Sequence, residues 1–517
     1  MFKMNSVVLM ISILISVNNG LTSNILAFLP SKARSHYGAF EPLLKELAEK
    51  GHNMTVLSPF PMKNPPSSYH HIQVEDEDLV MGFNPFSVAK NFKPILVPFR
   101  SWFIWPKFTE TILNKPSVQK LIHSEGLNFD LVLFENFYHE CFVALGHKFN
   151  APVVQLFPSI PNAGVAQWHR NPYDGSYIPD VNSGFCDNMS FIERLTNTVL
   201  SFMHTALGSF FYFPKQRDLM DKYFNYTGWE TRPSMENMLK NISLTLINTH
   251  FSVGTSRPLV PSYIDVAGMH LKPASSLPED LQDIMDNASD GVVYFSFGSV
   301  LKLTQLPENE FEIIIRQLGK VKQKVLFKWE SNTKIDFPPN IIVRKWFPQV
   351  DILGHPNCVL FITHGGIHST EEAIYFGVPM LAISVFGDQL HNSLVMQNRG
   401  AAIQIKYSEF TEDLFEIALY KMLNDKSFKQ KATELSQTFH DQPLKSLNKA
   451  IYWIEYVIRY NGAHHLKTAA GQLTWYEFLL IDGLFLVIIM RIIITIILWY
   501  VGKKLWRKFC CIKTKKN

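Results

Sequence analysis

Cysteine is scarce in this chain of 517 residues, which contains only five. Two of them, Cys510 and Cys511, lie near the C-terminus, so only Cys141, Cys186 and Cys358 remain for the rest of the chain. This excludes a disulfide-stabilised scaffold, and the fold must depend on its hydrophobic core. The formal net charge is only +4 and is concentrated in the C-terminal tail, so the composition does not indicate a nucleic-acid-binding protein.

Several well-known catalytic motifs are also missing. The sequence contains no GxxxxGK[ST], GxSxG, HExxH or CxxC pattern, which argues against a P-loop nucleotide hydrolase, an α/β hydrolase, a zinc protease and a thiol redox centre. It also shows no internal repeat and no low-complexity tract. The function must therefore be sought in less compact patterns along the chain.

Two long apolar runs lie at the ends of the chain. The first, residues 7–17, follows Lys3 and precedes small and polar residues, so residues 1–20 are predicted to be a signal peptide cleaved near Gly20. An uncleaved N-terminal anchor is the alternative. The second run, residues 483–502, is interrupted only by Arg491 and is long enough to cross a bilayer. We therefore predict a transmembrane helix over residues 478–502.

The tail after this helix, residues 503–517, contains seven lysines and arginines and no acidic residue. Because positive flanks stay in the cytosol, the tail is predicted to be cytosolic and the body luminal, which is a single-pass type I topology. The last five residues, KTKKN, resemble the KxKxx signal for the endoplasmic reticulum membrane, with an ordinary basic tail as the alternative. Five N-x-S/T sequons fit a luminal body and are predicted glycosylation sites: Asn53, Asn188, Asn225, Asn241 and Asn287.

The body alternates apolar runs with helical patterns, which is typical of α/β domains with parallel sheets. In the first half, strands are expected at residues 24–30, 53–59, 129–135 and 151–157. After the first strand we expect a Ser/Gly loop and then a helix over residues 40–50, which stops at Gly51. A second series of strands is expected at residues 291–299, 324–330, 341–349, 358–366, 378–389 and 401–407.

This pattern predicts two Rossmann-like domains, with the first over residues 21–250 and the second over residues 274–465. The Pro-containing segment 251–273 is expected to link them. One stretch of the first half, residues 91–108, is rich in aromatic side chains and is expected to be irregular. Three interpretations stay open for it: a packed excursion, an apolar acceptor pocket, or a surface that contacts the membrane.

Polar residues follow the predicted strands, at the places where each strand ends. In open parallel sheets, ligands bind beyond the carboxyl ends of the strands. Two such domains with these edges opposed would enclose one cleft. The residues concerned are Ser35, His36 and Glu135 in the first half, and Ser299, Trp346, Gln349, Thr363, His364, Asp388 and Gln389 in the second half.

Each polar group of the second half suits one part of a nucleotide sugar. Gly365 and Gly366 leave backbone N–H groups free for phosphate at a helix start, and His364 and Ser299 add side-chain donors. The remaining residues suit the base, the ribose and a sugar: an aromatic face, a carboxylate on the same helix and an acid–amide pair, namely Trp346, Glu372 and Asp388-Gln389. Any one of these residues alone is more often structural, so the prediction depends on the whole set.

The stretch from Trp346 to Gln389 resembles the signature of the UDP-glycosyltransferases, in particular the group similar to UDP-glucuronosyltransferases. The resemblance extends through residues 257–273, 294–299 and 449–466 to the apolar C-terminal run, and the chain as a whole resembles insect members. It implies a GT-B fold, with an acceptor-binding N-terminal domain, a UDP-sugar-binding C-terminal domain and one transmembrane helix.

The resemblance also implies roles for individual residues. Trp346 would stack on uracil, and Gln349 would contact the uridine. Glu372 would bind ribose, and His36 would be the general base, oriented by Glu135. The diphosphate would lie among Ser299, His364, Gly366, His368 and Ser369, and the sugar hydroxyls would bind Asp388 and Gln389.

Three positions depart from the family pattern. Ser384 stands where a proline is usual, and Lys328 stands where vertebrate members carry arginine. Glu135 stands where many members carry aspartate, so the base is held through one additional methylene. The acidic run at residues 75–78 contains the D-x-D pattern that carries metal in the other large glycosyltransferase fold, but it lies away from a strand end, and we interpret it as a solvated loop.

The predicted function is inverting transfer of a sugar, with glucose favoured, from a UDP-sugar to a small lipophilic acceptor for detoxification or metabolite conjugation. No metal and no other cofactor is expected, because donors from the protein meet the leaving diphosphate. The expected partners are the UDP-sugar, the acceptor and the membrane, and self-association stays open. Two alternatives are an inactive family member that binds lipophiles or a partner protein, and a hydrolase that uses His36 and Glu135.

Overall fold

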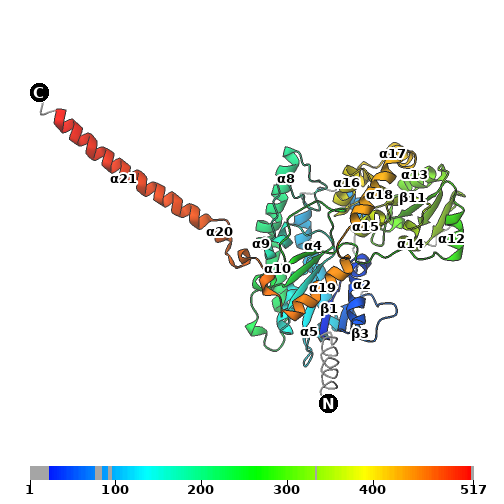
Figure 1. Ribbon diagram of the computed structural model, residues 1–517, viewed down its shortest axis with the longest axis horizontal. Coiled ribbons are helices and arrows are strands. Elements are labelled where there is room, and N and C mark those ends of the chain that lie inside the picture. Colours follow the sequence, from blue (N-terminus) through cyan, green and yellow to red (C-terminus); the bar gives the residue numbers. More distant parts are fainter. Residues whose placement is uncertain (1–21, 76–83, 91–92, 94–95, 332–334, 514–517) are drawn as a thin grey trace, which may run out of the picture. The chain divides into compact units, whose positions relative to one another are not determined.

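The computed structural model describes residues 22–75, 84–90, 93, 96–331 and 335–513 (Figure 1). The chain forms two compact units, residues 1–466 and residues 467–517, and each is described by itself. The predicted signal peptide, most of the acidic run and the last four residues of the tail lie outside the described residues.

The first sheet has seven parallel strands in the order β3-β2-β1-β4-β5-β6-β7. All four strands predicted for this half are present, and β3, β6 and β7 were not predicted. Strands β6 and β7 are short, with four and three residues, and β3 and β7 are the two edge strands of the sheet. The strands are β1 (Asn24–Phe28), β2 (Asn53–Ser58), β3 (Tyr69–Gln73), β4 (Leu131–Glu135), β5 (Val153–Phe157), β6 (Leu244–Ile247) and β7 (Tyr263–Asp265).

The second sheet has six parallel strands in the order β10-β9-β8-β11-β12-β13. All six were predicted, because each is an apolar run bounded by polar or turn residues. The strands are β8 (Val292–Ser296), β9 (Lys324–Lys328), β10 (Ile341–Arg344), β11 (Cys358–Thr363), β12 (Met380–Ser384) and β13 (Ala402–Lys406).

Helices connect the strands of both sheets. Those before and within the first sheet are α2 (Arg34–Glu49), α3 (Pro85–Ala89), α4 (Val97–Leu113), α5 (Pro116–Ile122), α6 (Ala144–Lys148), α7 (Ala163–Ala166), α8 (Phe191–Phe202), α9 (Gly208–Phe211), α10 (Phe213–Tyr223) and α11 (Met235–Lys240). Those that follow are α12 (Glu279–Asp286), α13 (Glu308–Gly319), α14 (Gln349–Leu353), α15 (Ile367–Tyr375), α16 (Gln389–Asn398), α17 (Glu412–Asn424), α18 (Ser427–His440), α19 (Ser446–Arg459), α20 (Trp475–Phe478) and α21 (Ile481–Lys513).

Helix α2 begins earlier than the sequence pattern predicted. It starts at Arg34, so Ser35 and His36 lie in its first turn and not in a Ser/Gly loop. The helix buries one apolar face, including Phe40, Leu43 and Leu47, against the first sheet. The predicted stop at Gly51 agrees with its φ of +98°, a left-handed conformation that glycine adopts without strain.

The expectation of an irregular segment at residues 91–108 is wrong over most of its length. Helix α4 runs through Val97–Leu113, with Pro98 in its first turn, where a missing N–H costs nothing, and Pro106 inside. Two prolines and dense aromatic residues hid the helical period from the sequence analysis. The helix buries Trp102, Ile112 and Leu113 in the core of the first sheet.

Each half of the body contributes an element to the other. Helix α3 precedes β4 in sequence, yet Phe86 and Ala89 belong to the core around the second sheet. Helix α19 lies in the range predicted for the second domain, yet Ile451 and Ile454 pack in the core of the first sheet together with α2. The range predicted as a linker, 251–273, contains β7, so the first sheet extends beyond the predicted boundary at residue 250.

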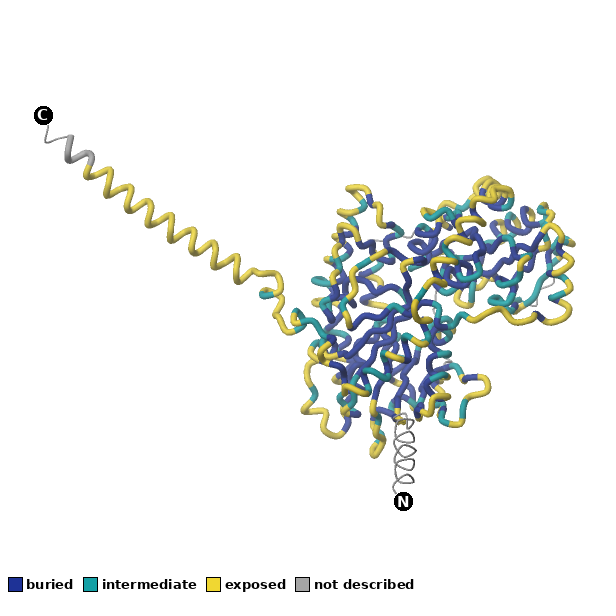
Figure 2. The backbone as a smooth tube through the Cα atoms, viewed as in Figure 1, coloured by how far each residue is buried: buried dark blue, intermediate teal, exposed yellow. Residues whose placement is uncertain are grey.

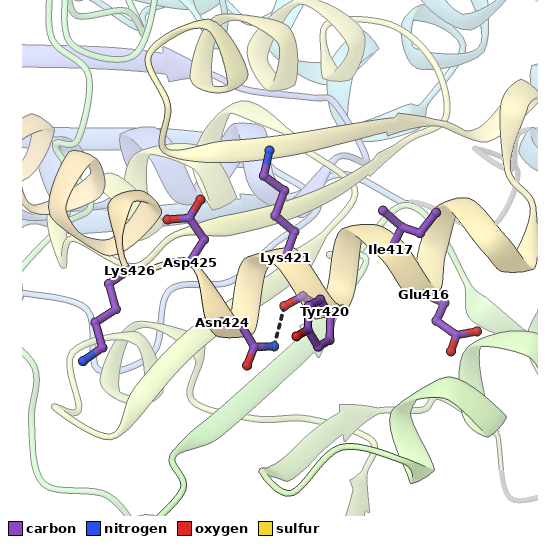
Figure 3. Close-up of a pocket in the computed structure, with 7 residues that line it drawn as sticks. All are labelled: Glu416, Ile417, Tyr420, Lys421, Asn424, Asp425 and Lys426. Atoms are coloured by element: carbon purple, nitrogen blue, oxygen red, sulfur yellow. Dashed lines mark hydrogen bonds between the residues drawn. The ribbon is translucent and has the colours of Figure 1, made fainter.

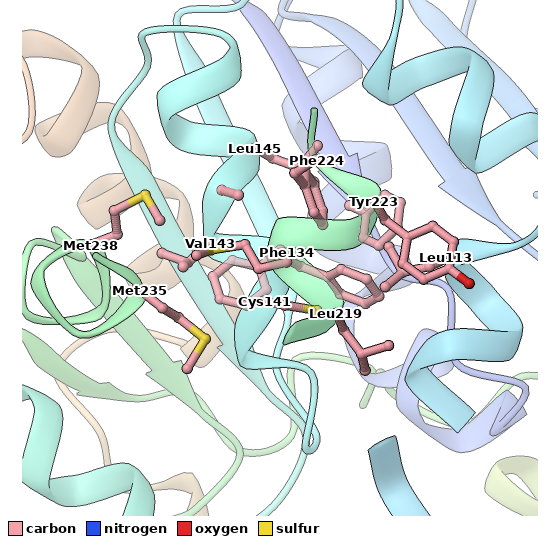
Figure 4. Packing of buried hydrophobic residues seen from close by; sticks show 14 of the residues in the cluster. Leu113, Phe134, Cys141, Val143, Leu145, Leu219, Tyr223, Phe224, Met235 and Met238 are labelled. Carbon is pink, nitrogen blue, oxygen red and sulfur yellow. The ribbon is translucent and has the colours of Figure 1, made fainter. Parts of the chain in front are cut away.

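Apolar side chains cover both faces of each sheet. Figure 4 shows part of one such cluster, in which Phe134 of β4 packs among side chains of neighbouring helices. Cys141 and Cys358 lie in these cores and Cys186 is also buried, and none of the three forms a disulfide. The body is thus stabilised by apolar burial, as the shortage of cysteine predicted.

Helix α8 leaves most of its apolar side chains exposed and buries a polar one. Its apolar residues Phe191, Ile192 and Phe202 are 66%, 65% and 56% exposed. Its polar residue Asn197 is completely buried and donates hydrogen bonds to the carbonyl oxygens of Gly175 and Ile178 at 2.8 Å and 2.7 Å. Asn197 and the apolar Leu200 thus hold α8 to the body, while its other apolar side chains face outward.

Helix α21 of the second unit has the length and composition of a membrane span. The candidate span is Ile481–Lys508, with a mean hydropathy of 2.7, and none of its apolar window is buried by protein (Figure 2). It begins close to the predicted residue 478 and continues beyond the predicted end at 502 into the basic tail. The helical pattern continues there because lysine and arginine are good helix formers.

Candidate active site

The two residues predicted to perform the chemistry lie together although they are 99 positions apart in sequence. His36 follows β1 and Glu135 ends β4, and β1 and β4 are neighbours at the point where the strand order of the first sheet reverses. His36 Nδ1 lies 2.6 Å from Glu135 Oε1. The Glu135 side chain is 1% exposed and that of His36 is 18% exposed, so the carboxylate holds the ring from below and leaves Nε2 for a ligand.

Aromatic rings surround this pair. The His36 ring meets Phe137 edge to face at 4.9 Å, and Phe137 meets Trp105 of α4 in the same way at 5.1 Å. Trp105 also stacks on Tyr138, which has a left-handed φ of +65°. Such a backbone is unfavourable for tyrosine, and the stacking at 5.2 Å helps to hold it. The sequence analysis assigned no role to these rings, although Trp105 lies in the aromatic stretch for which an acceptor pocket was one interpretation.

The turn between β11 and α15 is shaped by two glycines. A Cβ on Gly365 would lie 2.0 Å from Ser393 Oγ, and a Cβ on Gly366 would lie 2.5 Å from His364 Nε2. Gly365 also has a left-handed φ of +81°. A side chain would be strained or would clash at both positions, so the backbone at the start of α15 can be approached closely by an anion. Two N–H groups of this turn already have side-chain partners: that of Gly365 donates to Thr363 Oγ1 at 3.4 Å, and that of Ile367 favours the ionised form of Asp388.

His364 and His368 lie at this turn as neutral imidazoles. Burial, together with the charge of Lys328, lowers the pKa of His364 to about 4. Burial also lowers the pKa of His368 well below its usual range, assisted by the neighbouring rings of His270, His36 and His364. At neutral pH both rings can donate a hydrogen bond to an anion without carrying a net charge.

Lys328 lies between Trp346 and the His364 turn, because the Gly298 that it contacts lies against the His364 ring. Trp346 is 70% exposed, which is unusual for tryptophan and leaves its face open to a ligand. Lys328 Nζ lies 5.3 Å from the centre of the Trp346 ring and also donates a hydrogen bond to the carbonyl oxygen of Gly298. Ser299, the next residue, is exposed in the turn after β8.

Gln349 at the start of α14 contacts Ser369 and Glu372 of α15. The Gln349 amide donates to Glu372 Oε2 and lies 3.4 Å from Ser369 Oγ, while its oxygen accepts a 3.2 Å hydrogen bond from the Tyr294 hydroxyl. Glu372 is 8% exposed, so a buried carboxylate is held beside the turn that precedes α15. His270 approaches the same carboxylate from the segment after β7.

Asp388 and Gln389 begin α16. Asp388 Oδ2 accepts a 2.8 Å hydrogen bond from Asn392, and burial raises the pKa of Asp388, although Asn392 and the charge of His36 favour its ionised form. The charge of His36 is among the causes that act on the pKa of both Asp388 and His368, so the base lies within electrostatic range of these residues of the other half. Gln389 Oε1 accepts from the backbone N–H groups of Val385 and Phe386 at 3.0 Å and 3.2 Å, which leaves its amide group for a ligand.

Other features do not compete with this region. A hollow along α17, shown in Figure 3, is lined by Glu416, Ile417, Tyr420, Lys421, Asn424, Asp425 and Lys426, and contains none of the predicted site residues. In that hollow the Asn424 amide is bonded to the carbonyl of its own helix residue Tyr420 at 2.7 Å. Within the part of the chain that the structure describes, no three His, Cys, Asp or Glu side chains are grouped as a metal ion would need.

Comparison with known proteins decides the family. A family model described as UDP-glucoronosyl and UDP-glucosyl transferase matches residues 102–516. The chain belongs to this family. It is therefore a UDP-glycosyltransferase, an enzyme that moves a sugar from a UDP-sugar to an acceptor.

Similar members of the family cover nearly the whole chain. UDP-glucosyltransferase 2 of Dactylopius coccus is 35% identical over 98% of this chain and 98% of its own length. UDP-glycosyltransferase UGT5 of the same insect is 34% identical, over 94% of this chain and 93% of its own. Human UDP-glucuronosyltransferase 2B7 is 30% identical, over 95% of each chain.

Solved structures confirm the predicted GT-B fold of this UDP-glycosyltransferase. The glycosyltransferase VinC, solved in complex with DTDP, has a TM-score of 0.55 at 16% identity, and covers 84% of this chain and 99% of its own. The glycosyltransferase of kitacinnamycin has the same TM-score at 14% identity, with the same coverage. At these identities the likeness concerns the fold alone, and the roles of single residues depend on the geometry above.

Proposed function

We propose that this UDP-glycosyltransferase transfers glucose from UDP-glucose to a hydroxyl group of a small lipophilic acceptor, with inversion at the anomeric carbon, in detoxification or metabolite conjugation. The observation that carries the proposal is the pair His36–Glu135. Its imidazole is held at 2.6 Å by a buried carboxylate, at the point where the strand order of the first sheet reverses.

In the proposed reaction, His36 Nε2 takes the proton of the acceptor hydroxyl while the acceptor oxygen attacks the anomeric carbon. The bond between that carbon and the diphosphate oxygen breaks, and its electron pair leaves with UDP. Glu135 keeps the proton on Nδ1 and stabilises the imidazolium that forms. Attack from the side opposite the leaving group converts an α-linked donor into a β-glycoside.

The leaving diphosphate would lie at the start of α15. Backbone N–H groups in the first turn of α15, the His364 ring and the Ser299 hydroxyl would supply hydrogen bonds, and the cationic Lys328 is close by. These groups support transfer without a metal ion. We therefore expect activity to persist in EDTA, and loss of activity on chelation would contradict this part of the proposal.

The other contacts of the donor would follow from the order of groups along the cleft. Trp346 would stack on uracil, Gln349 and Glu372 would contact the uridine, and Asp388 and Gln389 would bind sugar hydroxyls. His368 and Ser369 complete the region around the diphosphate. Glucose is favoured because the similar insect protein at 35% identity is a UDP-glucosyltransferase, whereas the human UDP-glucuronosyltransferase is 30% identical.

A lipophilic acceptor is supported by the rings beside the base. Phe137 and Trp105 offer an apolar aromatic wall next to His36, where a polar acceptor would find few hydrogen-bond partners. Farther along α4, Phe99 and Phe103 are 42% and 59% exposed and point away from this wall. The aromatic segment thus has an inner side that suits an acceptor and an outer side that suits contact with lipid.

The proposed location is the endoplasmic reticulum membrane, with α21 as a type I anchor and the body in the lumen. The basic residues at the end of α21 and the five sequons support this orientation, because all five asparagines are exposed: Asn53, Asn188, Asn225, Asn241 and Asn287. Protease digestion of intact microsomes should trim only the tail, and endoglycosidase should lower the mass of the body. Digestion of the body in sealed microsomes would contradict the proposed orientation.

A screen of labelled UDP-sugars against a panel of lipophilic phenols and alcohols tests the activity itself. We expect acceptor-dependent glycoside formation with UDP-glucose above that with UDP-glucuronate. Release of free sugar at the same rate with and without acceptor would indicate a hydrolase. Binding of UDP without either reaction would indicate an inactive member of the family.

A further inference from the structure

His270 is a partly buried histidine that belongs to neither the catalytic pair nor the predicted donor-binding residues. It follows β7, an edge strand of the first sheet, and reaches α15 of the second half. Its Nε2 lies 3.6 Å from Glu372 Oε1, and its Nδ1 lies 3.8 Å from Glu371 Oε2. The side chain is 13% exposed, and its ring meets His368 edge to face at 5.1 Å.

The two carboxylates beside His270 are adjacent in sequence and both buried. Burial and the charge of Glu372 raise the pKa of Glu371 well above its usual range, while Gly268 and Asn248 favour its ionised form. Two such groups repel each other unless a donor or a cation lies between them. His270 is in that position, and neither of its ring nitrogens has a hydrogen-bond partner within the described part of the chain.

Glu372 is thereby held from two sides. Its Oε2 accepts a hydrogen bond from the Gln349 amide, and its Oε1 faces the His270 ring. Two partners at the two oxygens fix the plane of a carboxylate, which a single partner does not. Further lone pairs on both oxygens stay available for hydroxyl groups of a ligand.

We propose that His270 is a positioning residue for the donor nucleotide: it orients Glu372 toward the ribose hydroxyls and keeps Glu371 out of their way. This inference rests on the proposed role of Glu372 within the proposed function. It also gives the first sheet a part in donor binding, because the segment that carries His270 continues from β7.

The test uses a ligand change to separate positioning from folding. UDP and 2′,3′-dideoxy-UDP are titrated calorimetrically into the full-length chain and into its His270→Ala, Glu372→Ala and doubly substituted variants. We expect His270→Ala to weaken the affinity for UDP about tenfold and to leave that for dideoxy-UDP unchanged. The dideoxy nucleotide has no ribose hydroxyl that could donate a hydrogen bond to Glu372. The double variant should be no weaker than Glu372→Ala, and His270→Gln, which keeps a donor, should restore part of the loss.

The outcomes separate the two proposals. Equal loss of both nucleotides in His270→Ala would assign the residue to packing alone and overturn the inference. If Glu372→Ala distinguishes the two nucleotides and His270→Ala does not, the role of Glu372 stands and that of His270 fails. If neither variant distinguishes them, both roles fail, whereas the proposed transfer is judged separately by turnover of the unaltered protein. His355→Ala is the matched control, since His355 is also a partly buried histidine. It lies in the second half and is bonded to Gln282 and Asp286.

Discussion

The two halves of the body use the same sheet edge in different ways. In the second half, the turns after β8, β10, β11 and β12 each place polar residues at the edge, and together these residues suit every part of a UDP-sugar. In the first half the pair His36 and Glu135 lies beside the aromatic rings of Phe137 and Trp105. In the proposed function, donor recognition depends on short turns, whereas the acceptor side depends on longer segments between strands.

The largest effect should come from separating chemistry from donor binding. His36→Ala removes the base of the first half and should lower transfer by about 10²–10⁴-fold, while UDP affinity stays within about twofold of the parent. Turnover with UDP-glucose and calorimetric titration of UDP measure the two properties. His70→Ala, an exposed histidine on β3, is the control, and near-normal turnover of His36→Ala would refute the assignment.

The next effect concerns the helix that crosses between the halves. Phe86 of α3 is fully buried against Phe297 and Tyr407 of the second half, with ring centres at 6.4 Å and 5.1 Å. Phe86→Ala should lower the free energy of unfolding by about 3–5 kcal/mol, because it leaves a cavity between them. Chemical denaturation measures the loss.

Two controls accompany this substitution. Phe86→Leu should retain most of the stability, and Phe103→Ala, at a position that is 59% exposed, should change it by about 0.5 kcal/mol or less. An unchanged denaturation midpoint for Phe86→Ala would show that α3 does not join the two halves in solution.

Within the second half, substitutions at the proposed uracil contact and at the proposed sugar contact should affect different properties. Trp346→Ala should weaken UDP by about 1–3 kcal/mol through lost stacking. Asp388→Ala should leave UDP affinity nearly unchanged but impair transfer, because it leaves a sugar hydroxyl unpaired at a cost of about 1–3 kcal/mol. Calorimetry with UDP and steady-state kinetics with UDP-glucose measure the two. Equal loss of UDP affinity in both variants would contradict the assignment of Trp346 to the base and Asp388 to the sugar.

Acid stability gives the smallest effect and compares buried histidines in the two halves. Burial lowers the pKa of His139 to about 3 and that of His364 to about 4. An unfolded chain binds these protons near pH 6.5 and the folded chain does not, so each residue destabilises the fold as the pH falls from about 6.5 toward those values. Glu140, whose pKa is raised by burial to about 7, acts in the opposite direction.

A difference between variants isolates one histidine. His139→Gln should flatten the dependence of unfolding free energy on pH between pH 5 and 6.5, by a slope that approaches about 1.4 kcal/mol per pH unit as the pH falls toward 5, since the effect of Glu140 is common to both proteins. Thermal unfolding at several pH values measures the slope. Parallel curves for parent and variant would mean that His139 titrates normally in the folded protein.

The same contrast explains how far the sequence could lead. The six strands of the second sheet and the residues at their ends were predictable, because each strand is an apolar run and each turn carries its polar residue within a few positions. The strand-end pattern placed His36 and Glu135 at one edge of the sheet, but their pairing was predicted only through the resemblance to the family. The 2.6 Å distance confirms that they meet, whereas their catalytic role stays a prediction.

Other features depend on packing that no local pattern records. For this reason the sequence analysis missed the helical conformation of α4, the crossing of α3 and α19 between the halves, and the strands β3, β6 and β7. His270 could not be given a role from the sequence, since its partners lie on α15, about a hundred positions away. Trp105, Phe137 and Tyr138 were likewise hidden, because aromatic residues are as common in a core as in a pocket.

The exposed apolar side chains of α8 affect how the enzyme can be prepared. Deleting residues 467–517 removes the apolar helix α21, yet Phe191, Ile192 and Phe202 stay exposed on the body. An apolar surface of this kind drives self-association in water. The truncated body should therefore sediment as aggregates without detergent. It should become monodisperse when Ile192 and Phe202 are replaced by lysine, since their side chains take no part in the core.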